Sequence, residues 1–540
     1  MKIKKEAKEI WAEYERGRSS KQSVGLYENY KNNENFYIGK QWEGLNAPDL
    51  EKPVINVLKR VVSYFIAMIV TDDITVNFTP FERKDGQEMI ARILAREVEK
   101  SWERGKMKEA NRLSVRNAAV DGDACVHYYY DVDAEILRAE VVENIDVFFG
   151  NTQSADVQAQ PYILFATYKP LDDAKELARK HGADPELLAP DNEQNIMGNN
   201  ETDNDLVTIL TKYWMEKGSV WCQVSAASVV IRKAWDTKYA MYPIAYFSWE
   251  RVKNSCHGAA AVTGLIPNQV AINRLFSMAI HHIKTMAFPQ VIFDQTKVMG
   301  NWKSGPGVAM GVIGSPNDAI ATGFRVPDMS NQVLLTIDNL IERTMQFMGA
   351  SDSALGTVRP DNTSAIIAAQ KATAMPLEIQ RMEYFRFVED GVRIMVEMMR
   401  TDYGPRAVMV DARYVMSAED IQALASAGID VPSEIELNFD FGNLDAANMD
   451  MNVDIGSSAY WSELSQLQTM DNLFSKGIIQ DAILYLEGIP DKYIRNKEKI
   501  IAALEARQAA ARAQPAQPAT PATPQIAPRP PEGVTPPAVF

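Results

Sequence analysis

Apolar side chains follow a helical period in three long segments in the second half of the chain. The first segment runs from Thr263 to Met286, with Pro267 in its first turn, where a missing N–H is tolerated. Its apolar positions lie close to one helical face, with Ile272 and Met278 on the other side. The main face consists of Leu265, Ile266, Val270, Leu275, Phe276, Ala279, Ile283 and Met286. Two apolar sides predict a helix with neighbours on both.

The pattern changes after this helix to short β-branched runs that glycine and proline interrupt. Residues 287–327 are therefore expected to form strands and turns. A second helical pattern begins near Asp328 or Ser330 and continues to Gly349. At about 1.5 Å of rise per residue, each of the two helices is roughly 30 Å long. The pattern predicts two rods with a small β element between them in the sequence.

A polar loop and a third helix follow. Residues 350–362 (ASDSALGTVRPDN) are mostly small or polar, which is typical of an exposed loop. Apolar helical spacing resumes at Thr363 or Ser364 and continues to Arg400, with a bend or break near Met375 and Pro376. A long helix behind a loop would hold that loop rigidly.

The first half of the chain mixes helical and strand patterns, which predicts a predominantly helical α+β fold. Helices are expected at 3–39, 55–70, 88–103, 107–119 and 171–181. Strands are expected at 74–80, 125–133, 136–142, 146–150 and 161–170, and the runs 207–216 and 220–236 are expected to pair as a hairpin. Residues 183–205 are expected to form a mobile excursion, and the proline-rich end a disordered tail from about Gln514.

None of the candidate enzyme motifs in the sequence has all of the residues that it requires. The lysines that follow Gly39 and Gly105 lack both the upstream glycine and the Ser or Thr of a phosphate-binding loop. No G-x-S-x-G sequence is present. We therefore expect no enzymatic activity and no cofactor. The most membrane-like window, Val54 to Val70, contains Lys59 and Arg60 and is short for a span, so no membrane partner is expected.

Metal-ligating patterns are equally weak. His281 and His282 point about 100° apart on a helix, and the pair Cys256-His257 lacks further ligands. The acidic run 199–210 has neither the glycine nor the glutamate of a calcium loop. Four aspartates flank a strand, where turn-forming or solvated roles are favoured: Asp121, Asp123, Asp131 and Asp133. Three cysteines without a C-x-x-C pair predict reduced thiols: Cys125, Cys222 and Cys256.

Charge is distributed unevenly. The formal net charge is −15, the wrong sign for tight DNA binding through phosphate neutralisation. No Lys or Arg occurs between Tyr414 and Ser475, and such a stretch repels DNA unless it faces outward. Lys2, Lys4, Lys5 and Lys8 make the beginning of the chain basic. Either this segment pairs with an acidic surface of a neighbouring copy, or it is a solvated helix end.

The order of these patterns resembles the portal proteins, or head-to-tail connectors, of tailed bacteriophages. Besides the three helices, five stretches are similar to that family: FYIGKQW (36–42), KPVINVLKRVVSYFIAMIV (52–70), AAVDGDACVHYYYD (118–131), ENIDVFFGN (143–151) and YPIAYFSWERVKNSCHGAAAVTGLIPNQVAINRLFSMAI (242–280). The resemblance covers about Glu34 to Arg400. Each stretch alone has low specificity, and their order along the chain carries the resemblance.

The resemblance implies a portal fold with named parts. Residues 1–262 and 401–456 would form the wing, 263–286 and 328–349 the paired stem helices, and 287–327 the β-containing clip. The tunnel loop would be 350–362, with the long helix 363–400 behind it. A helical crown would occupy 457–511 and a disordered tail 512–540.

The resemblance also implies a function without chemistry. Portal proteins form a homo-oligomeric ring, twelve-fold in virions, at one capsid vertex, and double-stranded DNA enters and leaves through its channel. Implied partners are further copies of the chain, the DNA, the large terminase subunit, head-tail adaptors, and the major capsid and scaffolding proteins. The implied location is the virion, and the host cytoplasm during assembly.

Candidate site residues follow from these assignments. The tunnel loop offers Leu355, Val358 and Arg359 to DNA; alternatively, the loop packs at a subunit interface with Arg359 in a salt bridge. Lys297, Trp302, Lys303 and Arg325 are the clip candidates for docking, although Trp302 would equally fit between neighbouring subunits. The stem candidates are Arg274, His281, Lys284 and Arg343. The rival interpretation is a minor capsid or DNA-processing component that uses the same helices without a channel.

Overall fold

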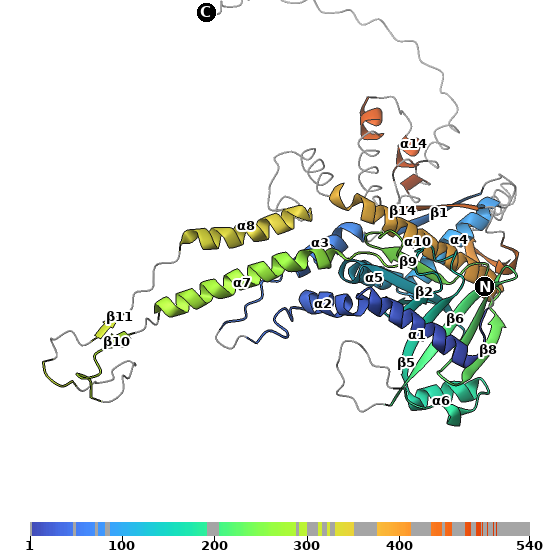
Figure 1. Cartoon of the computed structure of the whole chain (residues 1–540). Helices are drawn as coiled ribbons and strands as arrows, with labels where there is room; N and C mark the ends of the chain where they lie inside the picture. Colours follow the sequence, from blue (N-terminus) through green and yellow to red (C-terminus); the bar gives the residue numbers. More distant parts are fainter. Residues whose placement is uncertain are drawn as a thin grey trace, which may run out of the picture. The chain divides into compact units, whose positions relative to one another are not determined.

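The computed structural model describes residues 3–46, 50–70, 74–80, 87–191, 205–287, 291–299, 312–315, 321–323, 330–349, 375–411, 434–444, 449–455, 470–476 and 482–487, with a few single residues beyond. The chain divides into two compact units, 1–456 and 457–540. The first unit contains most of the described helices and all of the described strands (Figure 1). Because every described strand pair is antiparallel, the α+β expectation is confirmed at this level.

The helices of the first unit mostly begin and end near the expected residues. They are α1 (Ala7–Ser23), α2 (Leu26–Ile38), α3 (Val57–Ile69), α4 (Gln87–Arg104), α5 (Met107–Asp121), α6 (Leu171–Lys180), α7 (Ala261–Ala287), α8 (Asn331–Phe347) and α10 (Glu378–Met398). Short turns of helix are η1 (Pro185–Leu187), η2 (Met375–Leu377), η3 (Met399–Tyr403) and η4 (Phe441–Asn443). The predicted break near Met375 and Pro376 falls at η2, directly before α10, while the first part of that predicted helix, 363–374, lies outside the described residues. Ser330 caps α8, its side chain accepting from the Gln332 N–H.

Two larger sheets occupy the first unit. The five-stranded sheet has the order β4-β5-β6-β7-β8, formed by β4 (Val147–Phe149), β5 (Ile163–Pro170), β6 (Leu206–Glu216), β7 (Ser219–Ser225) and β8 (Val230–Asp236). The three-stranded sheet has the order β3-β2-β9, formed by β3 (Ile136–Val142), β2 (Asp123–Asp131) and β9 (Ile244–Ser248). The largest apolar core lies among α3, α4, α5, α10 and the three-stranded sheet.

Three strand pairs complete the described sheets. Strand β1 (Ile74–Pro80) pairs with β14 (Met449–Ile455), and β12 (Pro405–Asp411) pairs with β13 (Glu434–Asp440). The third pair joins β10 (Val291–Phe293) to β11 (Ala321–Gly323) within the segment between α7 and α8. The first two pairs connect segments that local sequence patterns do not link, whereas the third lies within the β element expected at 287–327.

Helix α1 lies on the five-stranded sheet and is held there by buried polar contacts. Ile10 and Tyr14 pack with Phe148 and Trp214 of the sheet. Lys212 of β6 donates to Glu13 of α1 with 2.6 Å between Nζ and Oε2, and both side chains are almost completely buried. At the surface, Lys5 pairs with Glu216 at 3.0 Å. At least one lysine of the basic beginning therefore binds its own chain.

The prediction of a single helix over residues 3–39 is wrong, because the structure has two helices there. Gly25 separates α1 from α2 with a positive φ of 71°, which is the left-handed region that glycine enters without strain. Apolar spacing continues across this residue, so the periodicity concealed the break.

The expected hairpin is also wrong in its second half. The run 220–236 forms two strands, β7 and β8, joined by a turn in which the Ala226 N–H donates to Val229 O at 2.8 Å. The small residues Ser225, Ala226 and Ala227 mark this turn but include neither Gly nor Pro. Of the predicted hairpin, only the pairing between β6 and β7 is confirmed.

The four aspartates that flank β2 separate into two kinds. Asp131 accepts from the Ala134 N–H and pairs with Arg138, and Asp133 is exposed, as predicted for turn residues. Asp121 and Asp123 are buried, so the solvated role predicted for them is wrong. All three cysteines are free thiols in buried positions, as expected for reduced residues.

The second unit is described at only a few positions. It contains α14 (Ala482–Glu487) and a short helical segment at 470–475. The rings of Phe474 and Tyr485 lie 4.5 Å apart, and the Tyr485 hydroxyl donates to Asp471. Local contacts therefore join the two helical segments.

Candidate functional site: the paired helices

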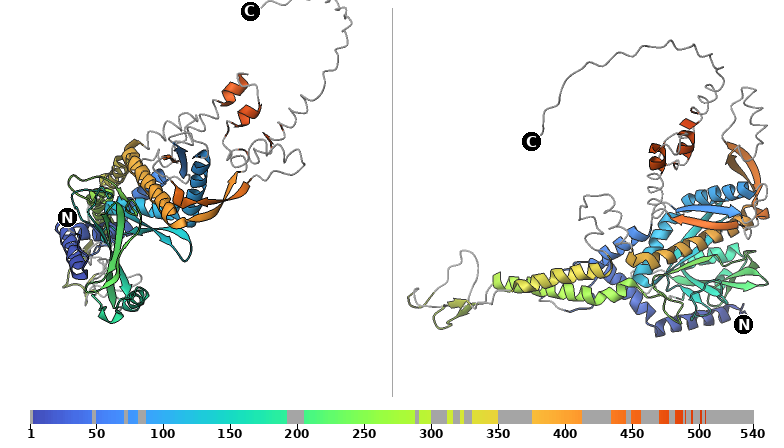
Figure 2. Two further views of the ribbon diagram at one scale, coloured as in Figure 1. Left: turned by 90° about the vertical axis from the view of Figure 1, so that its right-hand side faces the viewer. Right: turned by 90° about the horizontal axis from the view of Figure 1, so that it is seen from above.

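Helices α7 and α8 run antiparallel and side by side, and we call them the paired helices (Figures 1 and 2). The 27 residues of α7 extend roughly 40 Å at about 1.5 Å per residue. Asn268, near the start of α7, donates to the Thr344 hydroxyl near the end of α8 at 3.3 Å. The β10 and β11 strands lie in the segment that connects the opposite ends of the two helices.

The first half of α7 is bound to the chain segment that precedes α3 by a stripe of buried polar side chains. Gln269, Asn273 and Ser277 recur every four residues and are each at least 97% buried. The Gln269 amide accepts from the Val57 N–H at 3.0 Å and donates to Ile55 O at 2.6 Å. Asn273 donates to Gln41 and Ser277 to Glu51 O, both at 2.6 Å. These hydrogen bonds hold the first half of α7 against the segment before α3.

Sequence reasoning missed this stripe because only apolar positions were used to define the face of α7. The signal was present: three amide or hydroxyl side chains at a spacing of four residues fall on one side of an otherwise apolar helix. Buried polar side chains at such a spacing indicate that they bind backbone N–H and C=O groups of another segment. Here that segment is the extended chain before α3.

We expect the substitution Gln269→Leu to lower the free energy of unfolding by about 3 kcal/mol, since the Val57 N–H and the Ile55 carbonyl keep only their mutual contact at 2.9 Å and the buried Asn273 amide oxygen loses its donor. The exposed Gln346 on α8 provides a matched control, for which Gln→Leu should change stability by less than about 0.5 kcal/mol. Urea denaturation followed by circular dichroism measures both. Equal effects of the two substitutions would show that the amide contacts of Gln269 contribute nothing.

Large apolar side chains remain exposed on the paired helices and at the start of α10. We call them the exposed apolar set; its members, with their exposed fractions, are Met278 (63%), Ile283 (55%), Leu334 (42%), Leu335 (58%), Phe347 (86%), Met375 (74%), Ile379 (71%) and Met382 (51%). Isolated exposed apolar residues are ordinary, but several on adjoining elements indicate an interaction surface. These elements thus have apolar sides that the described part of the chain leaves uncovered.

The predicted stem residues are all exposed on the paired helices. Arg274 and His281 are seven residues apart, about two turns, and so share one side of α7. Lys284 pairs with Glu51 at 3.1 Å, where both side chains are more than half exposed, so this ion pair stabilises the fold little. Arg343 lies on α8, near the end that meets the start of α7. The four residues are spread along the rods and form no compact site.

Most other predicted site residues lie outside the described residues: Leu355, Val358, Arg359, Trp302, Lys303 and Arg325. Lys297 is described and lies in an exposed turn after β10, with its Nζ 4.0 Å from Asp294 Oδ2. Its backbone carbonyl accepts from the Ile313 N–H at 2.9 Å. The Lys297 side chain is thus at the surface of the insert, as docking requires.

No model of a known protein family matches this chain, and no curated protein matches it in sequence. Within the part of the chain that the structure describes, no group of three or more His, Cys, Asp and Glu side chains has the arrangement of a metal site. None of the helices described there combines the length and apolar character needed to cross a membrane.

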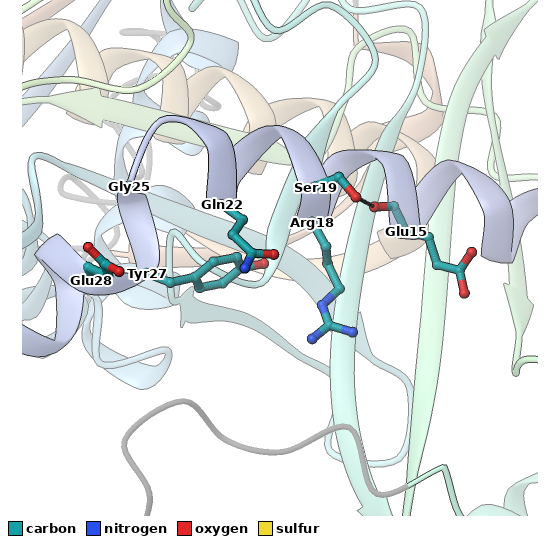
Figure 3. A pocket seen from close by; sticks show the side chains of 7 residues that line it. All are labelled: Glu15, Arg18, Ser19, Gln22, Gly25, Tyr27 and Glu28. Atoms are coloured by element: carbon teal, nitrogen blue, oxygen red, sulfur yellow. Dashed lines mark hydrogen bonds between the residues drawn. The ribbon is translucent and has the colours of Figure 1, made fainter.

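A groove of about 550 Å³ lies at the bend between α1 and α2 (Figure 3). It is lined by Glu15, Arg18, Ser19, Gln22, Gly25, Tyr27 and Glu28. The Ser19 hydroxyl donates to the Glu15 carbonyl of its own helix at 2.9 Å. The lining mixes both signs of charge, with Glu15 and Glu28 beside Arg18.

His257 has a partner that the sequence did not predict. Its Nδ1 lies 3.0 Å from Asp123 Oδ2, and the same oxygen accepts from the Gly258 N–H at 3.1 Å. Burial alone would lower the pKa of His257, but the charge of Asp123 and its hydrogen bond raise that pKa to about 9. The contact fixes the loop that leads from β9 into α7.

Proposed function

We propose that this chain is the portal protein of a tailed bacteriophage. The observation that supports the proposal most is the antiparallel pair α7 and α8, with a strand pair between them in sequence and uncovered apolar side chains along them. The sequence resemblance supports the same interpretation, because its stem and clip fall on these elements.

The exposed apolar set supports assembly of identical copies. Fully burying one Leu, Ile, Met or Phe side chain stabilises an interface by about 1.5–3 kcal/mol. The set is spread over α7, α8 and the start of α10. Surfaces on different elements of one copy suit a heterologous contact, in which one surface binds a different surface of the next copy. Such contacts form a ring where the rotation between copies closes, and an open filament where it does not.

In the proposed ring, the paired helices line a channel through which duplex DNA passes. The net charge of −15 fits a wall that lets DNA slide, since tight phosphate contacts would oppose movement. The chain contains no phosphate-binding loop, so the energy for packaging would come from a separate ATPase, the large terminase subunit. The insert between α7 and α8 would be its docking site and later that of the adaptors.

The proposed docking role predicts that a variant can lose DNA packaging while it keeps assembly of the chain. Replacing residues 288–326 by a short Gly/Ser linker should leave assembly of the chain intact but reduce DNA packaging into heads to background, because the ATPase loses its binding surface. Packaging is measured as nuclease-resistant DNA in an assembly extract, and assembly as particle mass.

A chain ending at residue 513 serves as the control and should package normally, because it lacks only the proline-rich segment. Normal packaging by the linker variant would contradict the docking role and favour a capsid component without a channel.

A further inference from the structure

The body of the first unit meets the start of α7 at a buried junction. Asn33 of α2 donates to Val120 O of α5 at 2.7 Å and to the hydroxyl of Thr263 in α7 at 2.8 Å. Gly122, with a φ of 102°, lies against Gly258, and a Cβ on Gly122 would be 2.4 Å from the Gly258 carbonyl oxygen. These contacts allow no side chain between α5 and the loop before α7.

Acidic groups outnumber cations inside this junction. The charged groups that face it are Lys21 of α1, Glu34 of α2, Arg116 and Asp121 of α5, Asp123 of β2, Glu143 and Asp146 of the β3–β4 turn, and His257 of the loop before α7. Other titratable side chains at its border are Tyr30, Cys125, Tyr168 and Cys256. The named carboxyl groups are five and the cations three.

Each of the three cations is already bound to other groups. Arg116 binds Glu34, and His257 binds Asp123. The Lys21 ammonium, which is buried, donates to the backbone carbonyls of Asn144 and Val147 at 2.6 and 2.5 Å. The remaining carboxyl groups at the junction therefore depend on neutral donors.

Asp121 is the carboxyl group with the poorest compensation. It is 93% buried, and its Oδ1 has no hydrogen-bond partner among the described residues. Within the same part of the chain, Glu143 accepts weak neutral contacts from Tyr30 at 3.3 Å and Asn117 at 3.4 Å. The NH₂ group of Asn33 binds the Val120 carbonyl and that of Asn144 binds the Asp121 carbonyl, but no described residue donates to the amide oxygen of either asparagine. A neutral carboxylic acid supplies a donor where an ionised carboxylate does not.

We propose that the junction is a proton-dependent latch: a proton held by Asp121 keeps α1, α2 and α5 packed against the loop before α7, and its loss loosens the attachment of α7. The latch belongs to the folded chain and does not depend on the proposed function. Its action reaches the paired helices through the Asn33 to Thr263 and Gly122 to Gly258 contacts.

The direction of the pH dependence follows from the groups involved. Burial, followed by the charge of Glu143, raises the pKa of Asp121 well above its usual 3.8. Burial also raises the pKa of Asp146, to about 6. A raised carboxyl pKa means that the folded state binds the proton more tightly than the unfolded state does, so stability is present at low pH and lost as pH rises. His257, with its raised pKa, acts in the same direction.

Lys21 acts in the opposite direction. Burial lowers its pKa to about 8, so the folded state gains stability from this residue as pH rises above that value. The test therefore compares variants at each pH rather than relying on the wild-type curve alone.

The experiment measures unfolding of the full chain from pH 5.5 to 9 for wild type, Asp121→Asn and the exposed control Asp133→Asn. Asn has the shape of the protonated carboxyl and cannot titrate. The unfolding constant of wild type and of the control should rise with pH by up to about tenfold per unit relative to Asp121→Asn. Glu143→Gln repeats the test at a second position if Asp121→Asn does not fold.

Hydrogen exchange, corrected for its intrinsic pH dependence, supplies the second measurement. Peptides from the start of α7 (261–270) should lose protection at high pH in wild type and keep it in Asp121→Asn, while α4 peptides respond equally in both. Parallel pH curves for wild type and Asp121→Asn would overturn the proposal. So would a difference in unfolding without any difference at the start of α7.

Discussion

Replacing Leu335 or Met278 by Glu should leave the chain folded but prevent its assembly. Both side chains are more than half exposed, at 58% and 63%, so a charge at either position meets water in the single chain. In an assembled ring the same charge would be desolvated against apolar neighbours without a partner, which costs several kcal/mol. Each interface would then weaken by at least about 100-fold, since 1.4 kcal/mol corresponds to a factor of ten.

Sedimentation velocity at micromolar protein measures this effect. Val132→Glu is the matched control, because Val132 is 73% exposed in the turn after β2, away from the paired helices. The control should assemble like wild type. If Leu335→Glu and Met278→Glu also assemble like wild type, the exposed apolar set is not an interface between copies.

Lys212→Met should lower the free energy of unfolding by about 3–5 kcal/mol, because it leaves a buried carboxylate without a partner. The Lys212 ammonium lies 2.6 Å from Glu13 Oε2, and the two side chains are 0% and 1% exposed. The same ammonium also donates to Lys4 O at 3.0 Å and lies 4.7 Å from the Tyr162 ring centroid. Because Glu13 is 1% exposed, bulk solvent would not replace the lost ammonium group.

Two further variants identify the cause. The double variant Lys212→Met with Glu13→Leu removes both charges and should recover most of the loss, because an apolar pair of similar volume needs no partner. Lys5→Met breaks the exposed pair with Glu216 and should cost less than about 1 kcal/mol. A double variant as unstable as the single one would mean that Lys212 acts through packing rather than through its charge.

The sequence predicted best those elements whose apolar pattern continues through the whole element. Helix α7 was expected at 263–286 and runs from Ala261 to Ala287, and α8 begins directly after Ser330, one of the two expected starting points. Strand β1 has the expected bounds. In each case the local pattern suffices to set the bounds, because the apolar side chains that become buried lie within the element itself.

The errors arise where a distant partner or a backbone conformation decides. Apolar spacing passes through Gly25, so only the positive φ reveals the break between α1 and α2. The pairing of β1 with β14 joins residues more than 300 positions apart, which no local pattern specifies. The sequence predicted Asp121 and Asp123 to be solvated because the segments that bury them, α2 and the loop before α7, are distant from β2 along the chain.

The candidate site was predictable in part. The pattern along α7 and α8 indicated rods with neighbours, but which side chains remain exposed depends on the packing of the N-terminal segment against α7. The clip and tunnel-loop candidates other than Lys297 lie outside the described residues and stay predictions.

Electron microscopy of the purified full-length chain, viewed along the symmetry axis of its particles, tests the central claim most directly. A portal predicts closed rings, twelve-fold in virions, around an opening that admits duplex DNA, with the paired helices forming the inner wall. A chain that stays monomeric at micromolar concentration at every salt concentration, with no ring in any image, would contradict the account.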